Sequence, residues 1–508
     1  MRTFRVPAGR ILGLLGGDLP VVSITLATAA LHLAVAGRYG IYGDELYFII
    51  CGRHPAFGYA DQPPLVPLID AATQVFGPSP WLLRLPAALA ATALVPLTAA
   101  FARLLGGTAL SAFLAAAGVA LAPMLSVLTS ISATWTFEPI AWTLCGYFVT
   151  LGVVERRERA FIWAGLVAGS SLEAKYGIAL WLGALAVGLA STEARWVFRS
   201  RSLWLGGALG IAIAAPNLLW QALHGWPFVA VMQQHQQAGS NLTGAVWQFG
   251  LVQVLVMNPV LAPLWLAGVT APFISARLQP ARFLAIAYLA AALINYGAGG
   301  RYYYLVAVYP PLMAVGAVAF AGLRTALAGA WMAAAALPFA IVLPVILPIL
   351  PLPALAAYIR VMPFEAYTLG APVGLVFSWE LGWPELEARV AKIYRALPDA
   401  EQRQTAIFAP NFGEAAAIDL YGRADALPHA ISGHNQYYLW GPGSGEIGTL
   451  IVVNGDPAAW AARCAALEPA DMFGVPFGHP MESDRPILVC HGYQGSLAAG
   501  WGHFRDFE

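Results

Sequence analysis

Charged residues are scarce in this 508-residue chain: 11% of its residues are Asp, Glu, Lys or Arg, whereas a soluble protein usually carries about 25%. Lysine is almost missing, because Lys175 and Lys392 are the only two. The 27 basic and 27 acidic residues cancel, so no net charge attracts the chain to nucleic acid. Cysteine is also rare, and the four cysteines are spaced too widely for a zinc-binding pair: Cys51, Cys145, Cys464 and Cys490.

Apolar residues are correspondingly abundant. They make up 59% of the chain, and the mean hydropathy is +0.66. Apolar runs of roughly 20 residues, the length that crosses a bilayer core, recur through the first two thirds of the sequence. We therefore predict a polytopic α-helical membrane protein with about eleven transmembrane helices: 19–37, 81–102, 108–128, 136–154, 160–173, 176–191, 203–220, 247–273, 283–298, 303–322 and 330–352.

The arginines predict the orientation of these spans. If the Arg-rich N-terminus is cytoplasmic, most basic residues near the spans fall on the same side, which is the usual positive-inside bias. An odd number of spans then places the C-terminus outside the cytoplasm. Five cations on the outer side are left unexplained by topology and are candidates for binding an anion: Arg38, Arg53, Arg84, Lys175 and Arg301.

The segment 160–191 predicts two short helices with a break between them. A single long helix would place the basic residues 155–159 and 195–201 on opposite sides of the membrane, against the charge bias. Two half-helices that meet near residues 173–177 keep both basic clusters inside, and such breaks are tolerated where they line a polar cavity. Lys175 would lie at this break.

The last 150 residues differ in composition. Strand-like runs at 405–409 and 448–453 alternate with a helix-like run at 385–397, so we predict a small α/β domain over 353–508, after a membrane module over 1–352. Cys464 and Cys490 both lie in this domain. The sequence fits a disulfide between them and two buried free thiols equally well.

The first outer loop, about 38–80, is long for a simple connection and rich in polar residues. Its acids Asp44 and Glu45 are adjacent, so on a helix they point about 100° apart and do not form a facing acid/base pair. One of them can serve as a base while the other orients a substrate, or both can simply favour the positive end of a helix dipole. The loop holds further candidate site residues: Arg53, His54, Tyr59, Asp61 and Gln62.

Candidate residues also stand at the ends of later spans. Glu138 precedes the fourth span, where a lone acid is also typical of a solvated helix cap. Arg301 follows a glycine pair and can bind phosphate through its planar fork of donors, although Tyr302 and its neighbours equally fit an aromatic belt. Lys175 is the strongest candidate, because an ammonium among apolar helices requires an anionic partner.

These motifs together resemble a known family. The signature includes DELY (44–47), GYADQPPL (58–65), FGPSPWLLRLPAAL (76–89), KY (175–176) and RYYY (301–304), and it continues in the C-terminal segments 411–422 and 427–442. In this order and spacing they resemble bacterial members of glycosyltransferase family 39, which are related to protein O-mannosyltransferases and lipid A aminoarabinose transferases.

The resemblance implies a GT-C fold and an enzyme of the inner membrane with its C-terminal domain in the periplasm. Such an enzyme moves a monosaccharide from a polyprenyl-phosphate donor to a lipid, glycan or protein acceptor, with inversion. Asp44 would be the base or acceptor-orienting acid, with Glu45 beside it. Lys175 and Arg301 would face the lipid-linked phosphate. No metal ligand set is evident, and the resemblance leaves a divalent cation open.

This chain departs from the family pattern at two positions. Relatives often have Lys or His where this chain has Gln62. They often have the shorter Asp where it has Glu138, a difference that shifts the carboxylate by about one methylene. A polytopic transporter or flippase for a lipid-linked sugar is the alternative interpretation, because a broken helix with a buried lysine also suits transporters. Against it, the ionisable residues gather in outer loops, and the two halves of the sequence show no matching hydropathy.

Overall fold

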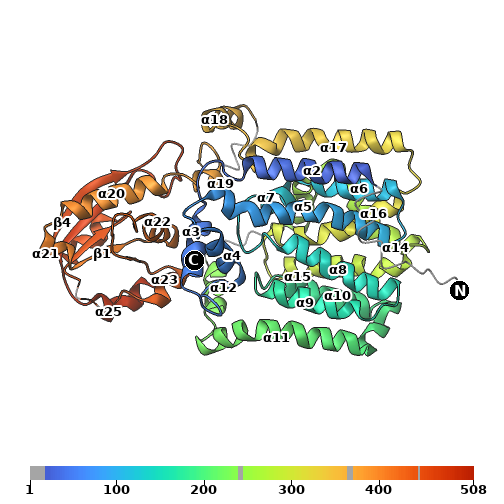
Figure 1. The fold of residues 1–508 in the computed structure, drawn as a ribbon, viewed down its shortest axis with the longest axis horizontal. Helices are drawn as coiled ribbons and strands as arrows, with labels where there is room; N and C mark the ends of the chain where they lie inside the picture. The colour runs from blue at the N-terminus through green and yellow to red at the C-terminus, as the bar shows by residue number, and fades with distance from the viewer. Residues whose placement is uncertain (1–17, 238–243, 363–369, 444, 446, 508) are drawn as a thin grey trace. The chain divides into compact units, whose positions relative to one another are not determined.

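The computed structural model describes residues 18–237, 244–362, 370–443, 445 and 447–507 (Figure 1). Its described residues fall into two compact units. The helical unit comes from 1–36, 84–216 and 241–347, and the mixed unit comes from 37–83, 217–240 and 348–508. The mixed unit therefore combines the first outer loop with the C-terminal third of the chain.

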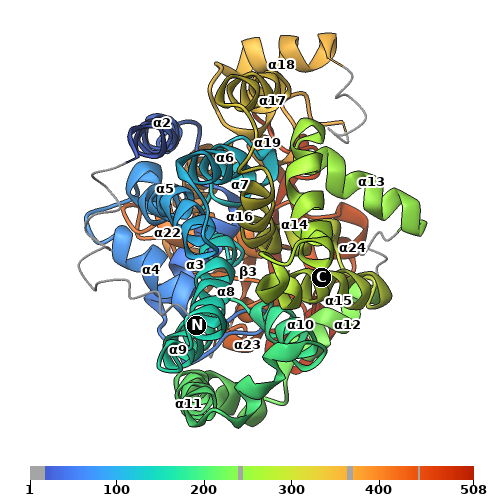
Figure 2. The same ribbon diagram turned by 90° about the vertical axis from the view of Figure 1, so that its right-hand side faces the viewer.

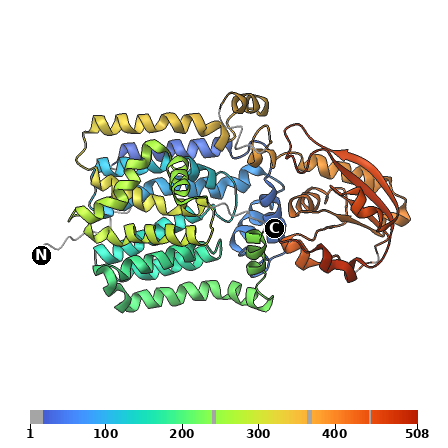
Figure 3. The same ribbon diagram turned by 180° about the vertical axis from the view of Figure 1, so that it is seen from behind.

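The helical unit is built from long apolar helices that run alongside one another in Figures 1 and 3 and are seen nearly end-on in Figure 2. All eleven apolar segments of the sequence are helical. The helices are α2 (Leu19–Val35), α5 (Pro80–Leu104), α6 (Ala109–Ala120), α7 (Pro123–Leu128), α8 (Glu138–Val154), α9 (Ala160–Leu172), α10 (Ile178–Ala190), η1 (Glu193–Arg199), α11 (Arg201–Leu223), α13 (Val246–Val256), η2 (Pro259–Leu261), α14 (Ala262–Ile274), η3 (Gln279–Ala281), α15 (Arg282–Gly297), η4 (Tyr302–Val308), α16 (Tyr309–Ala319) and α17 (Thr325–Ile346).

Within the described part of the chain, four helical segments are long and apolar enough to cross a bilayer, and six are if two bent helix pairs each count as one span. The predicted count of eleven is therefore not confirmed. The reason is helix length: α9 and α10 have 13 residues each, about 20 Å at 1.5 Å per residue, which is shorter than the roughly 30 Å hydrocarbon core.

The predicted break between the fifth and sixth apolar segments is present. Helix α9 ends at Leu172 and α10 begins at Ile178. The backbone N–H of Lys175 still bonds to the carbonyl of Ser171, so the chain leaves α9 through one last helical turn. Lys175 lies in the connection, as the sequence predicted.

Small residues allow some of these helices to approach closely. On α9, Gly165 and Gly169 face Gly206 and Gly210 on α11, and a Cβ atom on either α9 glycine would overlap the α11 backbone. Such small-residue contacts are typical of helix pairs in membranes, where packing replaces the hydrophobic effect as the driving force.

The mixed unit contains a five-stranded sheet in the order β2-β1-β3-β5-β4. Strand β1 pairs in parallel with β2 and β3, and β5 pairs antiparallel with β3 and β4. The α/β character predicted for the C-terminal region is thus present. The strands are β1 (Thr405–Phe408), β2 (Ala430–Ile431), β3 (Thr449–Val452), β4 (Cys464–Phe473) and β5 (Arg485–Tyr493).

Helices from three separate segments complete the mixed unit. Helix α3 packs on α4 and on α22, so the first loop is held by the C-terminal part of the chain (Figure 1). The helices are α3 (Gly43–Arg53), α4 (Leu65–Thr73), α12 (Pro227–Gln237), α18 (Leu352–Val361), α19 (Leu375–Ser378), α20 (Trp383–Ala396), α21 (Asp399–Gln402), α22 (Phe412–Tyr421), α23 (Asn435–Trp440), α24 (Pro457–Ala461), α25 (Leu497–Gly500) and η6 (Trp501–Phe504).

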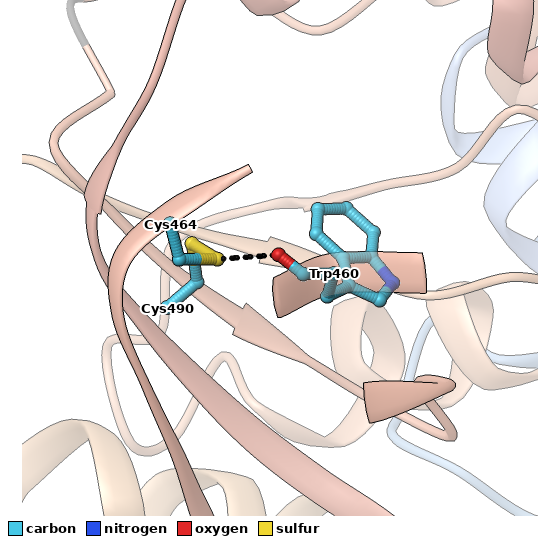
Figure 4. The surroundings of a disulfide bond; sticks show 3 residues. All are labelled: Trp460, Cys464 and Cys490. Carbon is cyan, nitrogen blue, oxygen red and sulfur yellow. Dashed lines mark hydrogen bonds between the residues drawn. A yellow bond between two sulfur atoms is a disulfide. The ribbon is translucent and has the colours of Figure 1, made fainter. Parts of the chain in front are cut away.

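A disulfide joins Cys464 and Cys490, which lie on the neighbouring strands β4 and β5 (Figure 4). The sequence left this pairing open, and the structure decides in favour of the bond. The carbonyl oxygen of Trp460 lies 3.1 Å from the Cys464 sulfur, so α24 also contacts the disulfide. The other two cysteines, Cys51 and Cys145, are buried and free.

Removing the disulfide should destabilise the sheet. The bond closes a loop across a sequence separation of 26 residues, for which chain entropy predicts about 3 kcal/mol of stabilisation. We expect the Cys464→Ser/Cys490→Ser variant to unfold at lower denaturant concentration, as measured by pulse proteolysis of the full chain. Dithiothreitol should lower the wild-type midpoint to the same value and leave the variant unchanged; equal midpoints under all conditions would contradict the prediction.

Candidate functional site

The acidic pair of the first loop lies in the first turn of α3, and its two members differ in environment. Glu45 is fully buried, and its carboxylate accepts a hydrogen bond of 2.9 Å from the backbone N–H of Tyr42. Glu45 therefore caps the start of the helix. Asp44 is partly exposed on the same turn, so of the two acids it is the one with access to a substrate.

An aromatic residue of the C-terminal segment holds the start of α3. The ring of Trp379 packs against Tyr42 at 5.0 Å between ring centroids, and a Cβ atom on Gly43 would lie only 2.8 Å from it. Trp379 is itself fixed, because its Nε1–H donates a 2.6 Å hydrogen bond to Glu482. Asp44 is thus carried on a turn whose backbone is clamped from the C-terminal side.

A second acid, which is partly buried, lies beside the same helix. Asp61 accepts hydrogen bonds from the hydroxyl of Tyr47 at 2.7 Å and from the side-chain amide of Asn435 at 3.2 Å. Burial raises its pKa to about 6, although both hydrogen bonds act in the opposite direction. The Tyr47 hydroxyl also accepts the backbone N–H of Gln436, so α3, Asp61 and α23 form one hydrogen-bonded network.

The neighbouring residues Tyr59 and Gln62 are buried. The Tyr59 hydroxyl donates to the carbonyl of Cys51 at 2.7 Å, which fixes the loop to α3. The side-chain amide of Gln62 makes no hydrogen bond to a nitrogen or oxygen among the described residues, although it lies close enough to the Cys51 thiol to influence that thiol's pKa.

In the helical unit, Glu138 and Lys175 form an ion pair. The Lys175 Nζ lies 3.1 Å from the Glu138 Oε2, and the two side chains are 21% and 7% exposed. Glu138 is the first residue of α8, and Lys175 lies in the break between α9 and α10. A Cβ atom on Gly177 would overlap the Glu138 carboxylate, so this glycine makes room for the pair.

Aromatic rings link this ion pair to Arg301. The Lys175 ammonium lies over the rings of Tyr304 and Trp135, at 4.8 Å and 5.7 Å from their centroids. The Tyr303 ring is 5.0 Å from Tyr304, and its hydroxyl accepts a 3.0 Å hydrogen bond from the Arg301 guanidinium. We call these five residues together with Glu138 the cation–aromatic cluster.

Four other predicted residues lie outside this cluster. Arg84 is buried at 2% exposure, and its guanidinium faces the carbonyl of Ala36 at 3.5 Å, which indicates a role in packing. Tyr302 is 39% exposed and contributes a backbone carbonyl to Gln253. Arg53 and His54 lie at the carboxyl end of α3, opposite to the end that carries the acids.

The predicted residues therefore gather in two places. Glu138, Lys175 and Arg301 come together in the helical unit, whereas the other group surrounds α3 in the mixed unit: Asp44, Glu45, Arg53, His54, Tyr59, Asp61 and Gln62. Among the described residues, no three His, Cys, Asp or Glu side chains are arranged to hold a metal ion.

Several residues of these networks are not among the predicted site residues. Tyr303 and Tyr304 follow Arg301 in the run RYYY, and Trp135 precedes Glu138 by three residues, so their places in the sequence are the signal that points to them. Asn435 and Trp379 are more than 300 residues away from the helix they support, and a single sequence carries no signal for such distant partners.

Comparison with known proteins gives a match to a family model over part of the chain and a similarity in fold over most of it. Residues 61–220 match the model of the dolichyl-phosphate-mannose-protein mannosyltransferase family. No curated protein matches the sequence at a significant level.

Solved structures match almost the whole chain. The ArnT structure from Cupriavidus metallidurans bound to undecaprenyl phosphate has a TM-score of 0.59 and 16% identity, covering 94% of this chain and 98% of that one. Its apo state gives 0.56 and 15% identity over the same shares. An Archaeoglobus fulgidus oligosaccharyltransferase gives 0.51 and 14%, covering 86% of this chain and 68% of that one.

These matches confirm the resemblance seen in the sequence. The fold is that of the GT-C membrane glycosyltransferases, and the matched family and structures are of the mannosyltransferase and ArnT type.

Breaking the Glu138–Lys175 pair should cost stability. Glu138→Gln leaves the ammonium without its carboxylate, which for a buried pair costs on the order of 3 kcal/mol. Unfolding of the purified protein in mixed detergent micelles measures this loss. In a Lys175→Met background the same substitution should cost much less, since no ammonium remains; an equal cost in both backgrounds would contradict a direct interaction.

Asp61 should titrate close to pH 6 instead of near pH 4. Because its pKa is raised in the folded state, its contribution to stability is full below about pH 4 and is lost as the pH rises through 6. Difference infrared spectroscopy of the carboxyl band, with Asp61→Asn as the control that lacks the band, measures this. Tyr47→Phe removes a donor to the carboxylate, so we expect a still higher pKa; a carboxyl that titrates near pH 4 in both proteins would refute the assignment.

Proposed function

We propose that the protein is a membrane glycosyltransferase that moves a monosaccharide from a polyprenyl-phosphate donor to an acceptor outside the cytoplasm. The family and fold comparisons support the reaction class, and one of the similar structures is bound to undecaprenyl phosphate. The observation that carries the proposal is the cation–aromatic cluster, which brings Lys175 and Arg301 together on the same pair of tyrosines.

Two fixed cations suit the departure of a lipid phosphate. When the bond between sugar and phosphate breaks, negative charge grows on the phosphate oxygens. Cations already held in position stabilise this charge without reorganisation, and the effect is large where water is excluded. Lys175 supplies a point charge, and Arg301 supplies a planar fork that can bind two oxygens at once.

Glu138 acts in this proposal as a positioning residue. In the structure it holds the Lys175 ammonium at 3.1 Å, which keeps a lysine charged among apolar helices. A donor phosphate would share the ammonium with Glu138 instead of replacing it, because an ammonium has three donor hydrogens.

Asp44 is the proposed base. It is partly exposed on the first turn of α3. Tyr47, which is buried and bonds to Asp61, lies about one turn further along the same helix. A positioned carboxylate that removes a proton from an acceptor hydroxyl typically contributes 10²–10⁴-fold to the rate. Direct attack opposite the phosphate would invert the anomeric centre.

The membrane arrangement belongs to the same proposal. The N-terminus would be cytoplasmic, and eleven helical segments of a module over 1–352 would lie in a bacterial inner membrane. The α/β domain over 353–508 and the first loop would then face the periplasm. The arginine bias of the sequence supports this orientation.

Substitutions in the two groups of residues should affect different steps, the transfer rate in one group and donor binding in the other. Asp44→Asn should lower the rate of transfer from a radiolabelled polyprenyl-phosphate sugar by at least about 100-fold and leave donor binding intact. Lys175→Ala and Arg301→Ala should instead weaken donor binding, each by roughly tenfold or more.

Lys392→Ala is the matched control, because Lys392 is the other lysine of the chain and is exposed on α20. It should leave both measurements unchanged. Wild-type transfer by Asp44→Asn would exclude this residue as the base. Transport of the lipid-linked sugar across vesicles, without transfer, would favour the flippase alternative.

A further inference from the structure

A second group of cations lies in the mixed unit, at the carboxyl end of α3. Arg53 is the last residue of this helix, and Arg423 follows the end of α22. The two side chains are close enough that the positive charge of Arg423, after burial, lowers the pKa of Arg53. The Nη1 of Arg53 is buried and has no hydrogen-bond partner among the described residues. A buried guanidinium N–H without an acceptor is costly.

Aromatic and imidazole groups extend this cluster. The His54 ring lies 4.9 Å from the Trp440 ring and 6.4 Å from the His429 ring, between centroids. His54, His429 and Arg423 are exposed. We call Arg53, His54, Arg423 and His429 the Arg53 cluster; three of its members are exposed, and the Nη1 atom of Arg53 is buried.

The acid beside this cluster is already engaged. Asp419 accepts hydrogen bonds from the backbone N–H of Ala430 at 2.9 Å and from the hydroxyl of Tyr437 at 2.8 Å. The Nδ1 atom of His429 lies 3.4 Å from one carboxylate oxygen of Asp419, so this imidazole also interacts with the carboxylate. The charge of Asp419 acts on both Arg53 and His429, and so does the positive charge of Arg423. Two guanidinium groups thus share the surroundings of one carboxylate, which leaves an excess of positive charge.

We propose that the Arg53 cluster binds a phosphate group carried by the acceptor. A phosphate offers three oxygens, enough to engage both arginines and a histidine at once, whereas a carboxylate offers two. That the phosphate belongs to the acceptor rests on the proposed function, whereas the anion site does not depend on that function. Arg53 is nine residues beyond Asp44, about 14 Å along the helix, so the bound phosphate would lie at that distance from the reacting hydroxyl.

Titration calorimetry of the purified full chain in an uncharged detergent tests the site, with glucose 1-phosphate as the probe and glucuronate as the carboxylate comparison. We expect the wild type to bind glucose 1-phosphate more tightly than glucuronate. Arg423→Ala and Arg53→Lys should each lower the affinity for glucose 1-phosphate roughly tenfold. Arg403→Ala, which removes an exposed arginine elsewhere in the same unit, should not change it.

Lys175→Ala separates this site from the donor site. If it leaves the glucose 1-phosphate affinity unchanged, the probe is bound at the Arg53 cluster even if no glycosyl transfer is ever found. Loss of probe binding in Lys175→Ala, no binding to the wild type, or equal affinity in Arg423→Ala and the wild type would each overturn the proposal.

Nanodiscs distinguish a membrane lipid from a soluble saccharide as the natural source of the phosphate. The affinity for glucose 1-phosphate is compared between discs that contain 30% phosphatidylglycerol and discs of pure phosphatidylcholine. If the affinity is lower in the phosphatidylglycerol discs, and this difference disappears in Arg423→Ala, the cluster binds a lipid headgroup. If both discs give the same affinity, it takes a phosphate that is presented from outside the bilayer.

Discussion

A lysine ammonium among apolar helices must be paired, and the helical unit is organised around this requirement. Glu138 provides the partner at the start of α8, the break between α9 and α10 brings Lys175 to it, and Gly177 leaves the space for the carboxylate. The pair is then bordered by aromatic rings that reach Arg301. A site with two cations and one acid keeps a positive charge that is available to an anionic ligand.

The mixed unit holds a short helix from a long loop in a fixed place. Helix α3 has 11 residues, too few to be stable alone in water. Its support comes from packing on α22, from the stacking of Tyr47 on Phe412 at 4.6 Å, and from the clamp of Trp379 on its first turn. The C-terminal third of the chain is therefore a scaffold for the first loop as well as a domain with its own sheet.

Local patterns in the sequence predicted the helical segments, the break near residue 175 and the strands at 405–409 and 448–453, because each depends on hydrophobic periodicity or charge bias over a short window. The need of Lys175 for an anionic partner was also predictable from the cost of an unpaired charge. Its identity was not, since Glu138 is 37 residues away. The same limit applies to Asp61, whose environment depends on Asn435, 374 residues away. The capping role of Glu45 depends on Tyr42, only three residues away, and a place at the start of a helix is one of the two interpretations that the sequence gives this acid.

We propose above all that Lys175 and Arg301 hold the phosphate of a lipid-linked sugar. A cryo-electron microscopy structure of the protein with bound polyprenyl phosphate tests it most directly. The account predicts phosphate density within hydrogen-bond distance of both the Lys175 ammonium and the Arg301 guanidinium, with Glu138 still in contact with Lys175. A phosphate bound elsewhere, with Lys175 paired to Glu138 alone, would contradict it.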